Sequence, residues 1–178
     1  MTKNELRKAM RSLNRGLDAR ARAEASERIV RRMEALEAFA AARTVGLFCA
    51  LPDEPDLSGA IERWRSSKRL VVPRVEGETM RFFEYDPQTL LPGAFGILEP
   101  GPAARLCPPR EIDLLFVPGV AFTPQGVRCG RGRGYYDRYL GRADFRAVKI
   151  GVCYAHQLVD DLPAEPHDMR VDAVITDR

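Results

Sequence analysis

The stretch Asp113-Leu-Leu-Phe-Val-Pro118 is the most strand-like run in this chain of 178 residues. Its four central residues are all large and apolar, which is typical of a strand that is buried on both faces of a sheet. Similar short runs recur at residues 44–49, 70–73, 80–84, 148–153 and 173–176. Helical patterns separate several of them. The sequence therefore predicts an α/β fold, with a mostly parallel or mixed sheet and helices on both faces.

Two helical segments precede the first of these runs. Thr2 and Glu5 have the spacing of a capping box, in which each side chain covers a free backbone N–H group of the other. The apolar residues that follow share one helix face at Leu6, Met10, Leu13 and Leu17. The next segment predicts one helix over residues 21–39, with Ile29, Met33 and Leu36 as its apolar stripe.

Shorter elements follow between the strands. Asp56 is expected to cap a helix that carries Leu57, Ile61 and Trp64. Residues 87–109 are rich in Pro and Gly and are expected to be mostly loop, with a short extended piece at Phe95-Gly-Ile-Leu98. A short helix is predicted over residues 135–140, ending at Gly141.

Charge and cysteine content exclude several classes of protein. The 28 Lys and Arg residues exceed the 25 Asp and Glu residues by only three, although residues 1–44 carry 11 against 6. No apolar run approaches the roughly 20 residues of a membrane span, and no apolar signal segment is present. The four cysteines have no CxxC spacing, so we expect reduced thiols rather than a zinc site. We expect one cytoplasmic domain over residues 1–178, a monomer without membrane or nucleic-acid partners.

A loop of alternating Gly and Arg is the strongest chemical signal. It reads Gly126-Val-Arg-Cys-Gly-Arg-Gly-Arg-Gly-Tyr-Tyr-Asp-Arg138. Glycine allows successive N–H groups to point into one concavity, and guanidinium groups beside such a nest hold phosphate oxygens. The short helix that follows adds its own N–H groups to this anion site. Instead of a phosphate site, this loop could be a flexible surface loop or a contact for nucleic acid. The Tyr-Tyr-Asp-Arg continuation favours an ordered phosphate site.

Three carboxylates are candidates for further roles. Asp137 follows the Gly–Arg loop closely enough to reach a metal ion on the bound phosphates, or it only complements the helix dipole. Asp168 either completes that metal site or caps a turn. Glu54 follows the first strand and could hold the N–H groups of a heterocycle, or it is a solvated loop acid.

Aromatic residues and histidines give weaker signals. Phe82, Phe83 and Tyr85 are expected mainly to pack in a strand, with stacking of one ring on a flat ligand as the alternative. His156 and His167 stand alone in the sequence, without a convincing nucleophile, and structural or loop roles are expected for both.

The sequence resembles the 5-formyltetrahydrofolate cyclo-ligase family over nearly its whole length. The likeness is carried by the long block from Pro118 to Arg138 that contains the Gly–Arg loop. Four shorter blocks follow the family order: Lys3-Asn-Glu-Leu-Arg7, Asp53-Glu-Pro-Asp56, Gly96-Ile-Leu-Glu-Pro100 and His167-Asp-Met-Arg-Val-Asp172. Two positions depart from the family pattern, since leucine is usual at Cys129 and threonine at Leu57.

The resemblance implies an enzyme that uses ATP and Mg²⁺ to convert 5-formyltetrahydrofolate to 5,10-methenyltetrahydrofolate, with release of ADP and phosphate. It implies Mg²⁺ ligation by Asp137 and Asp168, and candidate catalytic roles for Arg131, Arg133 and Tyr136. The implied ATP contacts are Lys3, Asn4, Glu5, Leu6, Arg7, Arg128, Cys129, Gly130, Arg131, Gly132, Arg133, Gly134, Tyr135 and Tyr136. The implied folate contacts are Cys49, Glu54, Arg131, Gly132, Arg133, Gly134 and Tyr135.

The chemistry of that reaction suits these residue types. A formamide oxygen is a poor leaving group, and transfer of the γ-phosphoryl group to it gives an N5-iminium phosphate from which phosphate departs as N10 attacks. The protein then needs to align and neutralise phosphates rather than supply a nucleophile. Two other functions remain as alternatives. One is a nucleic-acid-binding module, and the other is a sugar-phosphate isomerase or acyl-CoA transferase on a related scaffold.

Overall fold

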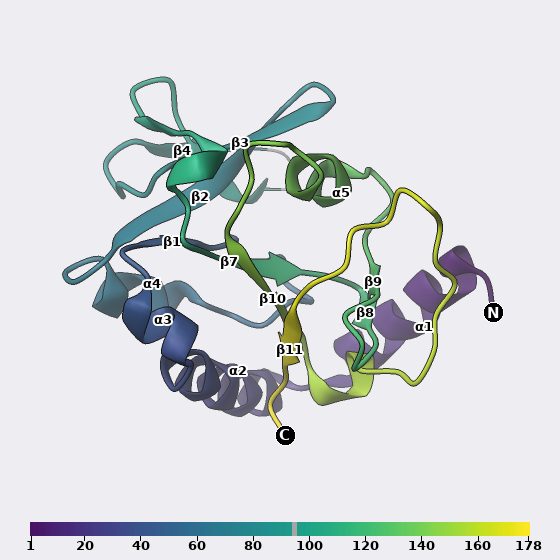
Figure 1. Ribbon diagram of the computed structural model, residues 1–178. Helices are drawn as coiled ribbons and strands as arrows, with labels where there is room; N and C mark the ends of the chain where they lie inside the picture. Colours follow the sequence, from purple (N-terminus) through teal and green to yellow (C-terminus); the bar gives the residue numbers. More distant parts are fainter. Residues whose placement is uncertain (94–95) are drawn as a thin grey trace.

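The computed structural model describes residues 1–93 and 96–178, and it is built on one seven-stranded sheet (Figure 1). The strand order is β11-β10-β7-β1-β2-β3-β6. The bounds are β1 Thr44–Gly46, β2 Arg69–Glu76, β3 Thr79–Glu84, β6 Leu106–Cys107, β7 Leu114–Pro118, β10 Val148–Val152 and β11 Ala173–Ile175.

The sheet is parallel over most of its width. Strands β11, β10, β7, β1 and β2 run parallel to their neighbours, and β3 and β6 add an antiparallel edge. The predicted run at 113–118 forms β7, an inner strand between β10 and β1, with Leu114, Leu115, Phe116 and Val117 fully buried. The α/β prediction is therefore confirmed.

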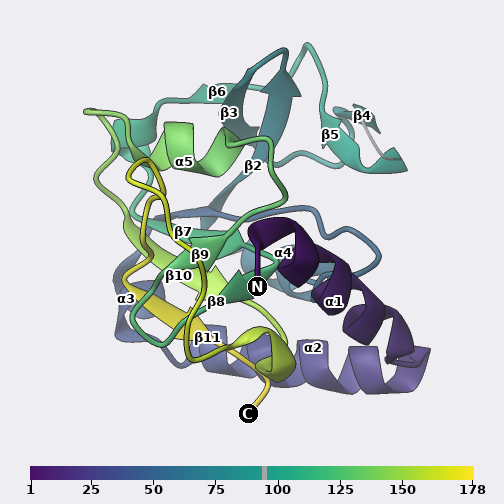
Figure 2. The ribbon, with the colours of Figure 1, turned by 90° about the vertical axis from the view of Figure 1, so that its right-hand side faces the viewer.

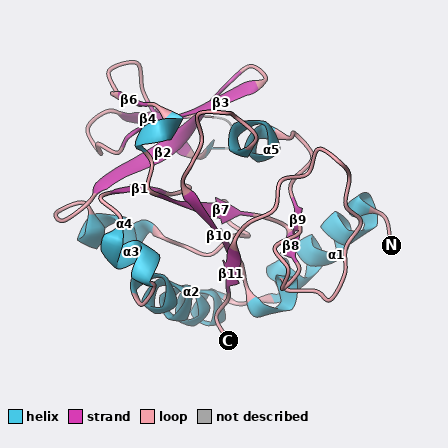
Figure 3. Cartoon of the chain, in the orientation of Figure 1, coloured by secondary structure: helices cyan, strands magenta, loops and turns pink. Residues whose placement is uncertain are grey.

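Five α-helices surround the sheet within the described residues (Figures 1 and 3). They are α1 Lys3–Gly16, α2 Ala19–Glu34, α3 Glu37–Ala41, α4 Ser58–Trp64 and α5 Tyr135–Leu140. Residues of α2, α3 and α4 share one core cluster with Val45, Leu114 and Ile150 of the strands. Helix α5 packs on the opposite face, where Tyr139 and Leu140 contact a second cluster with Phe82. Helices thus cover both faces, as predicted.

Helix α1 has the predicted capping box and most of the predicted apolar face, since Leu6 and Met10 are buried and Leu17 packs against the main core. The Thr2 side chain accepts from the amide of Glu5, and the Glu5 carboxylate accepts from the amide of Thr2. Leu6 and Met10 are buried in a small third cluster beneath the helix. Leu13, however, is half exposed, and Asn14 takes the buried position at the end of the helix. The prediction for Leu13 was wrong, because the buried position at this end of α1 is taken by Asn14.

The single helix predicted over residues 21–39 was also wrong, since the chain breaks it into α2 and α3. Asp18 caps α2 through a bond from the amide of Ala21, and the helix ends at Glu34. Leu36 then adopts extended backbone angles before α3 begins. The turn directs Phe39 onto Trp64, with 4.6 Å between the ring centroids. Burial of these aromatic rings outweighs the local helix preference.

Further short strands occupy segments that were expected to be loop. Strands β4 Leu90–Pro92 and β5 Leu98–Pro100 pair with each other inside the 87–109 stretch, where β6 also lies. Strands β8 Ala121–Phe122 and β9 Arg128–Cys129 form a second small ribbon beside α1 (Figure 2). The expected extended piece at Phe95-Gly-Ile-Leu98 begins outside the described residues, and only its last residue belongs to β5.

The expected short helix at 135–140 is confirmed, with Gly141 at its C-terminal end. Asp56 accepts a hydrogen bond from the amide of Ser58 in the turn before α4. The N-cap of α4 is Leu57, and no side chain of the described residues caps this helix, so the capping role predicted for Asp56 was wrong. All four cysteines lie within the described residues and carry free thiols. Among the described helices, none has both the length and the apolar character that a membrane crossing requires.

Candidate functional site

A cavity of about 830 Å³ lies at the carboxyl ends of the parallel strands and collects most of the predicted site residues. Its volume is within the range of small-molecule sites, and its position is the one expected for an open α/β sheet. The predicted residues that line it are Lys3, Arg7, Cys49, Glu54, Arg128, residues 130–137 and Asp168. Residues from the start, the middle and the last part of the chain thus line one cavity.

Four residues of the predicted ATP set do not line this cavity. Glu5 belongs to the capping box of α1, and Asn4 accepts a bond from Arg7 Nη1. Leu6 and Cys129 are buried together in the cluster beneath α1. The Cys129 thiol is therefore part of this small core. Leu57, the other departure, is also a buried core residue.

The Gly–Arg loop connects β9 to α5 and bends where the sequence has glycine. Gly132 has φ 108° and Gly134 has φ 71°, a left-handed region that residues with a Cβ avoid. The loop curls around the Arg7 side chain, because Arg7 Nε donates to the carbonyl of Gly130 at 2.8 Å. Arg133 is exposed and has no ion pair or hydrogen bond among the described residues. Its guanidinium is therefore free for an anionic ligand.

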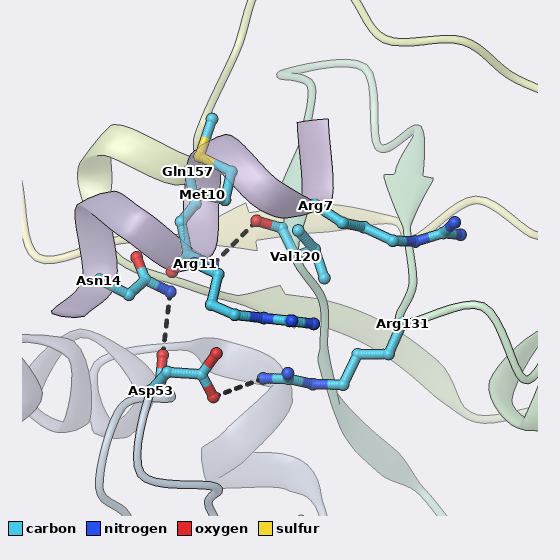
Figure 4. A pocket seen from close by; sticks show the side chains of 8 residues that line it. All are labelled: Arg7, Met10, Arg11, Asn14, Asp53, Val120, Arg131 and Gln157. Carbon is cyan, nitrogen blue, oxygen red and sulfur yellow. Dashed lines mark hydrogen bonds and ion pairs between the residues drawn. The ribbon is translucent and has the colours of Figure 1, made fainter. Parts of the chain in front are cut away.

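Arg131 makes the main electrostatic link across the cavity. Its Nη2 donates to Asp53 Oδ1 at 2.7 Å and to Glu54 Oε1 at 3.0 Å, and its Nε also donates to Glu54. Figure 4 shows Arg131 reaching toward Asp53 from the opposite wall. Glu54 is buried, and desolvation raises its pKa in spite of the arginine beside it. A buried carboxylate held by a fork of donors is suited to bind N–H groups of a heterocycle.

The N-terminus of α1 is joined to the loop before β11. Lys3 Nζ donates to Asp168 Oδ2 at 2.7 Å and to Glu165 Oε2 at 2.8 Å. Desolvation raises the pKa of Asp168, but the bonds from Lys3 and from the amide of Glu165 outweigh it and lower the pKa overall. The predicted ATP residue and the predicted metal ligand are thus direct partners.

Asp137 and Arg128 form the inner wall of the cavity. Asp137 Oδ1 accepts from the amide of Met169 at 2.9 Å, which places this carboxylate beside the neighbour of Asp168. Arg128 is buried, and its Nη2 lies 3.6 Å from Asp137 Oδ1. Its Nη1 donates to the carbonyl of Pro118, while its Nε has no partner among the described residues. An unpaired buried donor that lines a cavity favours an anionic ligand there.

The donor set around Asp168 suits a hard cation. Asp137 and Asp168 both line the cavity and both offer carboxylate oxygens, the ligands that Mg²⁺ prefers. A second grouping places ligand atoms of Glu165, His167 and Asp168 within 4.8 Å of one another. Asp168 is common to both sets, and Lys3 now neutralises it. Asp137 and Asp168 therefore offer the donor chemistry of the predicted metal role in one cavity, while the carboxylate grouped with Asp168 within 4.8 Å is that of Glu165.

The aromatic wall of the cavity differs from the aromatic residues singled out in the sequence. Phe82 and Phe83 are buried in strand packing, and the Tyr85 hydroxyl donates to Glu62. Among the described residues, the Phe and Tyr rings that line the cavity are those of Phe48, Tyr135 and Tyr136. Burial raises the pKa of the Tyr136 phenol, and burial also raises the pKa of the Cys49 thiol to about 11. Both groups therefore stay protonated at neutral pH.

Several lining residues were missed by sequence reasoning. Arg11, Arg15 and Arg22 line the end of the cavity nearest α1 and α2. The spacing of four residues from Lys3 through Arg7 and Arg11 to Arg15 was the available signal. A small pocket of about 20 Å³ adjoins Arg7, Arg11 and Arg131 (Figure 4). Apolar lining residues such as Pro73, Val75 and Met80 carried no distinctive sequence signal.

The fold and the cavity define an α/β protein with a cationic small-molecule site at the carboxyl edge of its sheet. The sequence matches the 5-formyltetrahydrofolate cyclo-ligase family over residues 1–177, and the chain belongs to this family of enzymes. It is 32% identical to the 5-formyltetrahydrofolate cyclo-ligase of Escherichia coli K12, over 94% of this chain and 96% of that protein.

Solved structures agree with this assignment. The NMR structure of Aquifex aeolicus 5,10-methenyltetrahydrofolate synthetase is 35% identical, with a TM-score of 0.90 over 100% of this chain and 91% of that chain. The Mycoplasma pneumoniae 5,10-methenyltetrahydrofolate synthetase is 26% identical, with a TM-score of 0.82 over the whole of both chains. The family resemblance stated from the sequence is therefore confirmed.

Proposed function

We propose that this protein closes the ring of 5-formyltetrahydrofolate to give 5,10-methenyltetrahydrofolate, using ATP and releasing ADP and phosphate. Family membership supports the cyclo-ligase activity. The observation that carries the proposal in full is the single cavity that joins the Gly–Arg loop to the buried Glu54 carboxylate. A phosphate-binding element and a heterocycle-binding element face one another there, as a reaction between ATP and a folate requires.

The Gly–Arg loop and α1 serve the nucleotide in this proposal. Arg133 is free to meet phosphate oxygens, and the unpaired Nε of Arg128 offers a buried donor. Lys3 and Arg7 bring two further positive charges from α1 to the same cavity. These groups hold the γ-phosphoryl group near the formyl oxygen and neutralise its charge during transfer. No protein nucleophile is needed for that step.

Glu54 and the aromatic wall serve the folate. The Glu54 carboxylate accepts N–H groups of the pterin edge, while Arg131 holds it in place. Phe48 and Tyr136 provide apolar surface beside this carboxylate. The folate is thereby oriented so that its N5-formyl oxygen meets the phosphoryl donor. N10 can then attack the N5-iminium phosphate that forms, and the N10 proton leaves with the phosphate. The leaving phosphate then remains among the arginines.

Asp137 and Asp168 would hold Mg²⁺ in this site. When bound, the ion neutralises phosphate charge during phosphoryl transfer. The chain's own contribution is to keep the two carboxylates at one wall, through the Asp137 bond to the amide of Met169. Lys3 must share Asp168 with the ion or move away from it.

One assay tests the proposal. The purified protein is mixed with 5-formyltetrahydrofolate, ATP and Mg²⁺, and the rise in near-ultraviolet absorbance of the methenyl product is followed. We expect product only when all three are present, with one ADP formed for each methenyl group. Product formation without ATP would contradict the proposal. ATP hydrolysis at the same rate with and without 5-formyltetrahydrofolate would also contradict it. A titration with RNA is the control for the nucleic-acid alternative.

A further inference from the structure

Three side chains from three separate segments donate hydrogen bonds to backbone carbonyls of the acidic loop that carries Glu54. Arg22 Nη1 of α2 donates to the carbonyl of Pro52 at 2.7 Å. Asn14 Nδ2 of α1 donates to the carbonyl of Asp53 at 3.0 Å. The Tyr154 hydroxyl, just after β10, donates to the carbonyl of Glu54 at 3.2 Å. We call Asn14, Arg22 and Tyr154 the carbonyl clamp, because they bind three consecutive backbone carbonyls.

Burial of the Asn14 side chain costs free energy unless its polar atoms are hydrogen-bonded. It is 3% exposed on the face of α1 that also buries Leu6 and Met10. A buried amide is unfavourable unless both of its ends are paired. Its Nδ2 faces the Asp53 carbonyl, as Figure 4 shows, and its Oδ1 faces the Nε2 of His156. Because a carbonyl can only accept, the amide orientation is fixed and His156 donates through Nε2–H.

His156 belongs to the same assembly. Its ring stacks on Tyr154, with 5.8 Å between the centroids and 13° between the planes. The next residue, Gln157, caps Tyr154 by accepting from its amide and donates to the carbonyl of Val120. The segment after β10 is thus tied to the segment after β7 as well as to the clamp. The donors are rigidly placed by packed elements.

The clamp sets the position of the Glu54 side chain. Within the loop, the Glu54 carboxylate accepts from the amide of Leu51, and the Glu54 amide donates to the Leu51 carbonyl. These local bonds fix the shape of the turn but not its place in the cavity. The clamp contributes to that placement through the loop backbone, while Arg131 acts on the side chains of Asp53 and Glu54.

We infer that Asn14, Arg22 and Tyr154 are positioning residues for folate recognition, acting through Glu54. The inference rests on the proposed function, which makes Glu54 the pterin acceptor. A shift of about 1 Å in such a carboxylate is enough to weaken alignment strongly. The residues touch the loop backbone, so they tune where the carboxylate stands without contacting the reacting atoms.

The first test measures folate binding and kinetics in Tyr154→Phe, Asn14→Leu and Arg22→Gln. Each change deletes one clamp bond. Asn14→Leu also removes the bond between Asn14 Oδ1 and His156, and Arg22→Gln also removes the bond from Arg22 Nε to the carbonyl of Leu17. We expect the folate dissociation constant and KM to rise roughly three- to tenfold, as the loss of one hydrogen bond allows, while the KM for ATP stays as in the parent. Arg20→Gln is the matched control, because Arg20 lies on the same helix as Arg22 and, within the part of the chain that the structure describes, pairs only with Glu24.

The second test is a double-mutant cycle with Glu54→Gln. If the clamp acts through Glu54, each clamp substitution should change folate affinity less than twofold once Glu54 is already altered. If the clamp residues only stabilise the fold, each substitution should weaken folate binding by the same factor with and without Glu54→Gln. That weakening should then correlate with the loss of thermal stability. The melting temperature of every variant is therefore recorded alongside.

The outcomes separate the two proposals. If the parent converts 5-formyltetrahydrofolate but the clamp variants bind it normally, or if the cycle is additive, the inference is overturned and the function stands. If Glu54→Gln itself leaves folate affinity unchanged, the inference is overturned as well. If the parent neither binds nor converts the folate, the proposed function fails first and the inference fails with it.

Discussion

The Glu54 side chain is an ion-pair partner and a buried acceptor at the same time. Its Oε1 takes both Arg131 bonds, and its Oε2 takes the amide of Leu51. We expect Glu54→Gln to weaken folate binding by about 1–3 kcal/mol, since an amide would present a donor where the pterin also presents one. Isothermal titration with 5-formyltetrahydrofolate measures the loss. A parent-like affinity would make Glu54 a purely structural acid.

The pH dependence of folate binding follows from the same residue. Desolvation raises the pKa of Glu54, so its protonated fraction grows at a higher pH than for an ordinary glutamate. Only the carboxylate accepts N–H groups through both oxygens. Folate affinity should therefore be complete above the raised pKa and decrease as the pH falls through it. This acid limb should be absent in Glu54→Gln, and its persistence there would assign the titration to another group.

Arg133 offers the clearest separation between nucleotide and folate binding. It is exposed, it lines the cavity, and it has no partner among the described residues. We expect Arg133→Ala to raise the KM for ATP about ten- to a hundredfold, the value of one charge-assisted bond, with folate binding little changed. Arg146→Ala is the control, because Arg146 is exposed but does not line the cavity. Equal ATP kinetics in both variants would contradict the assignment.

At the scale of elements, α1 is attached to the rest of the site by Lys3. The Lys3 bonds lower the pKa of Asp168 against an opposing desolvation, so they stabilise the fold while Asp168 is ionised. We expect Lys3→Met to lower the free energy of unfolding by about 1 kcal/mol at pH 7. Because the pKa of Asp168 is lower in the folded protein, Asp168 stabilises the fold fully at pH values above its pKa in the unfolded chain. This stabilisation is lost as the pH falls through the pKa of the folded state. The difference from the parent should thus close below about pH 4.

Urea unfolding of both proteins across this pH range checks the expectation. Lys8→Met serves as the control, because Lys8 is exposed on the same helix. A difference that stays constant down to pH 3 would mean that Lys3 stabilises α1 by packing rather than through Asp168.

The elements that the sequence predicted well are those whose pattern is local. The 113–118 run, the capping box of α1 and the Gly141 end of α5 needed only neighbouring residues to define them. The break between α2 and α3 could not be predicted, because it follows from the contact of Phe39 with a tryptophan 25 positions later in the chain. Strands β8 and β9 were missed for a related reason: two-residue strands have no detectable period.

The residues of the candidate site also divide into those that local sequence predicts and those that depend on contacts formed on folding. The Gly–Arg loop and Glu54 were found from residue type, spacing and family likeness. Asn14 and Tyr154 were not, because their roles depend on carbonyl groups that become neighbours only after folding. An asparagine on an apolar helix face was the one local sign. The monomeric state and the cytoplasmic location stay predictions.

At the scale of the whole molecule, the two ends of the chain close one wall of the cavity. The start of α1 bonds to the loop at residues 165–168, and α5 bonds to Met169 through Asp137. A ligand that contacts this wall therefore joins segments that are remote in sequence. Binding there should raise the stability of the whole fold in proportion to the logarithm of ligand concentration.

The substitution Asp137→Asn tests whether Mg²⁺ is part of the ligand that joins the segments of this cavity wall. Asparagine keeps an oxygen that can accept from the amide of Met169, so the fold should be retained. It removes the charge that offsets a cation, so turnover should fall at least tenfold, with partial recovery at raised Mg²⁺. Mg-ATP should also raise the melting temperature of the parent more than that of the variant. Asp144→Asn is the control, because Asp144 pairs with Arg142 away from the cavity. If Asp137 only complements the dipole of α5, the variant should lose about 0.3–1 kcal/mol of stability while turnover and its Mg²⁺ dependence stay as in the parent.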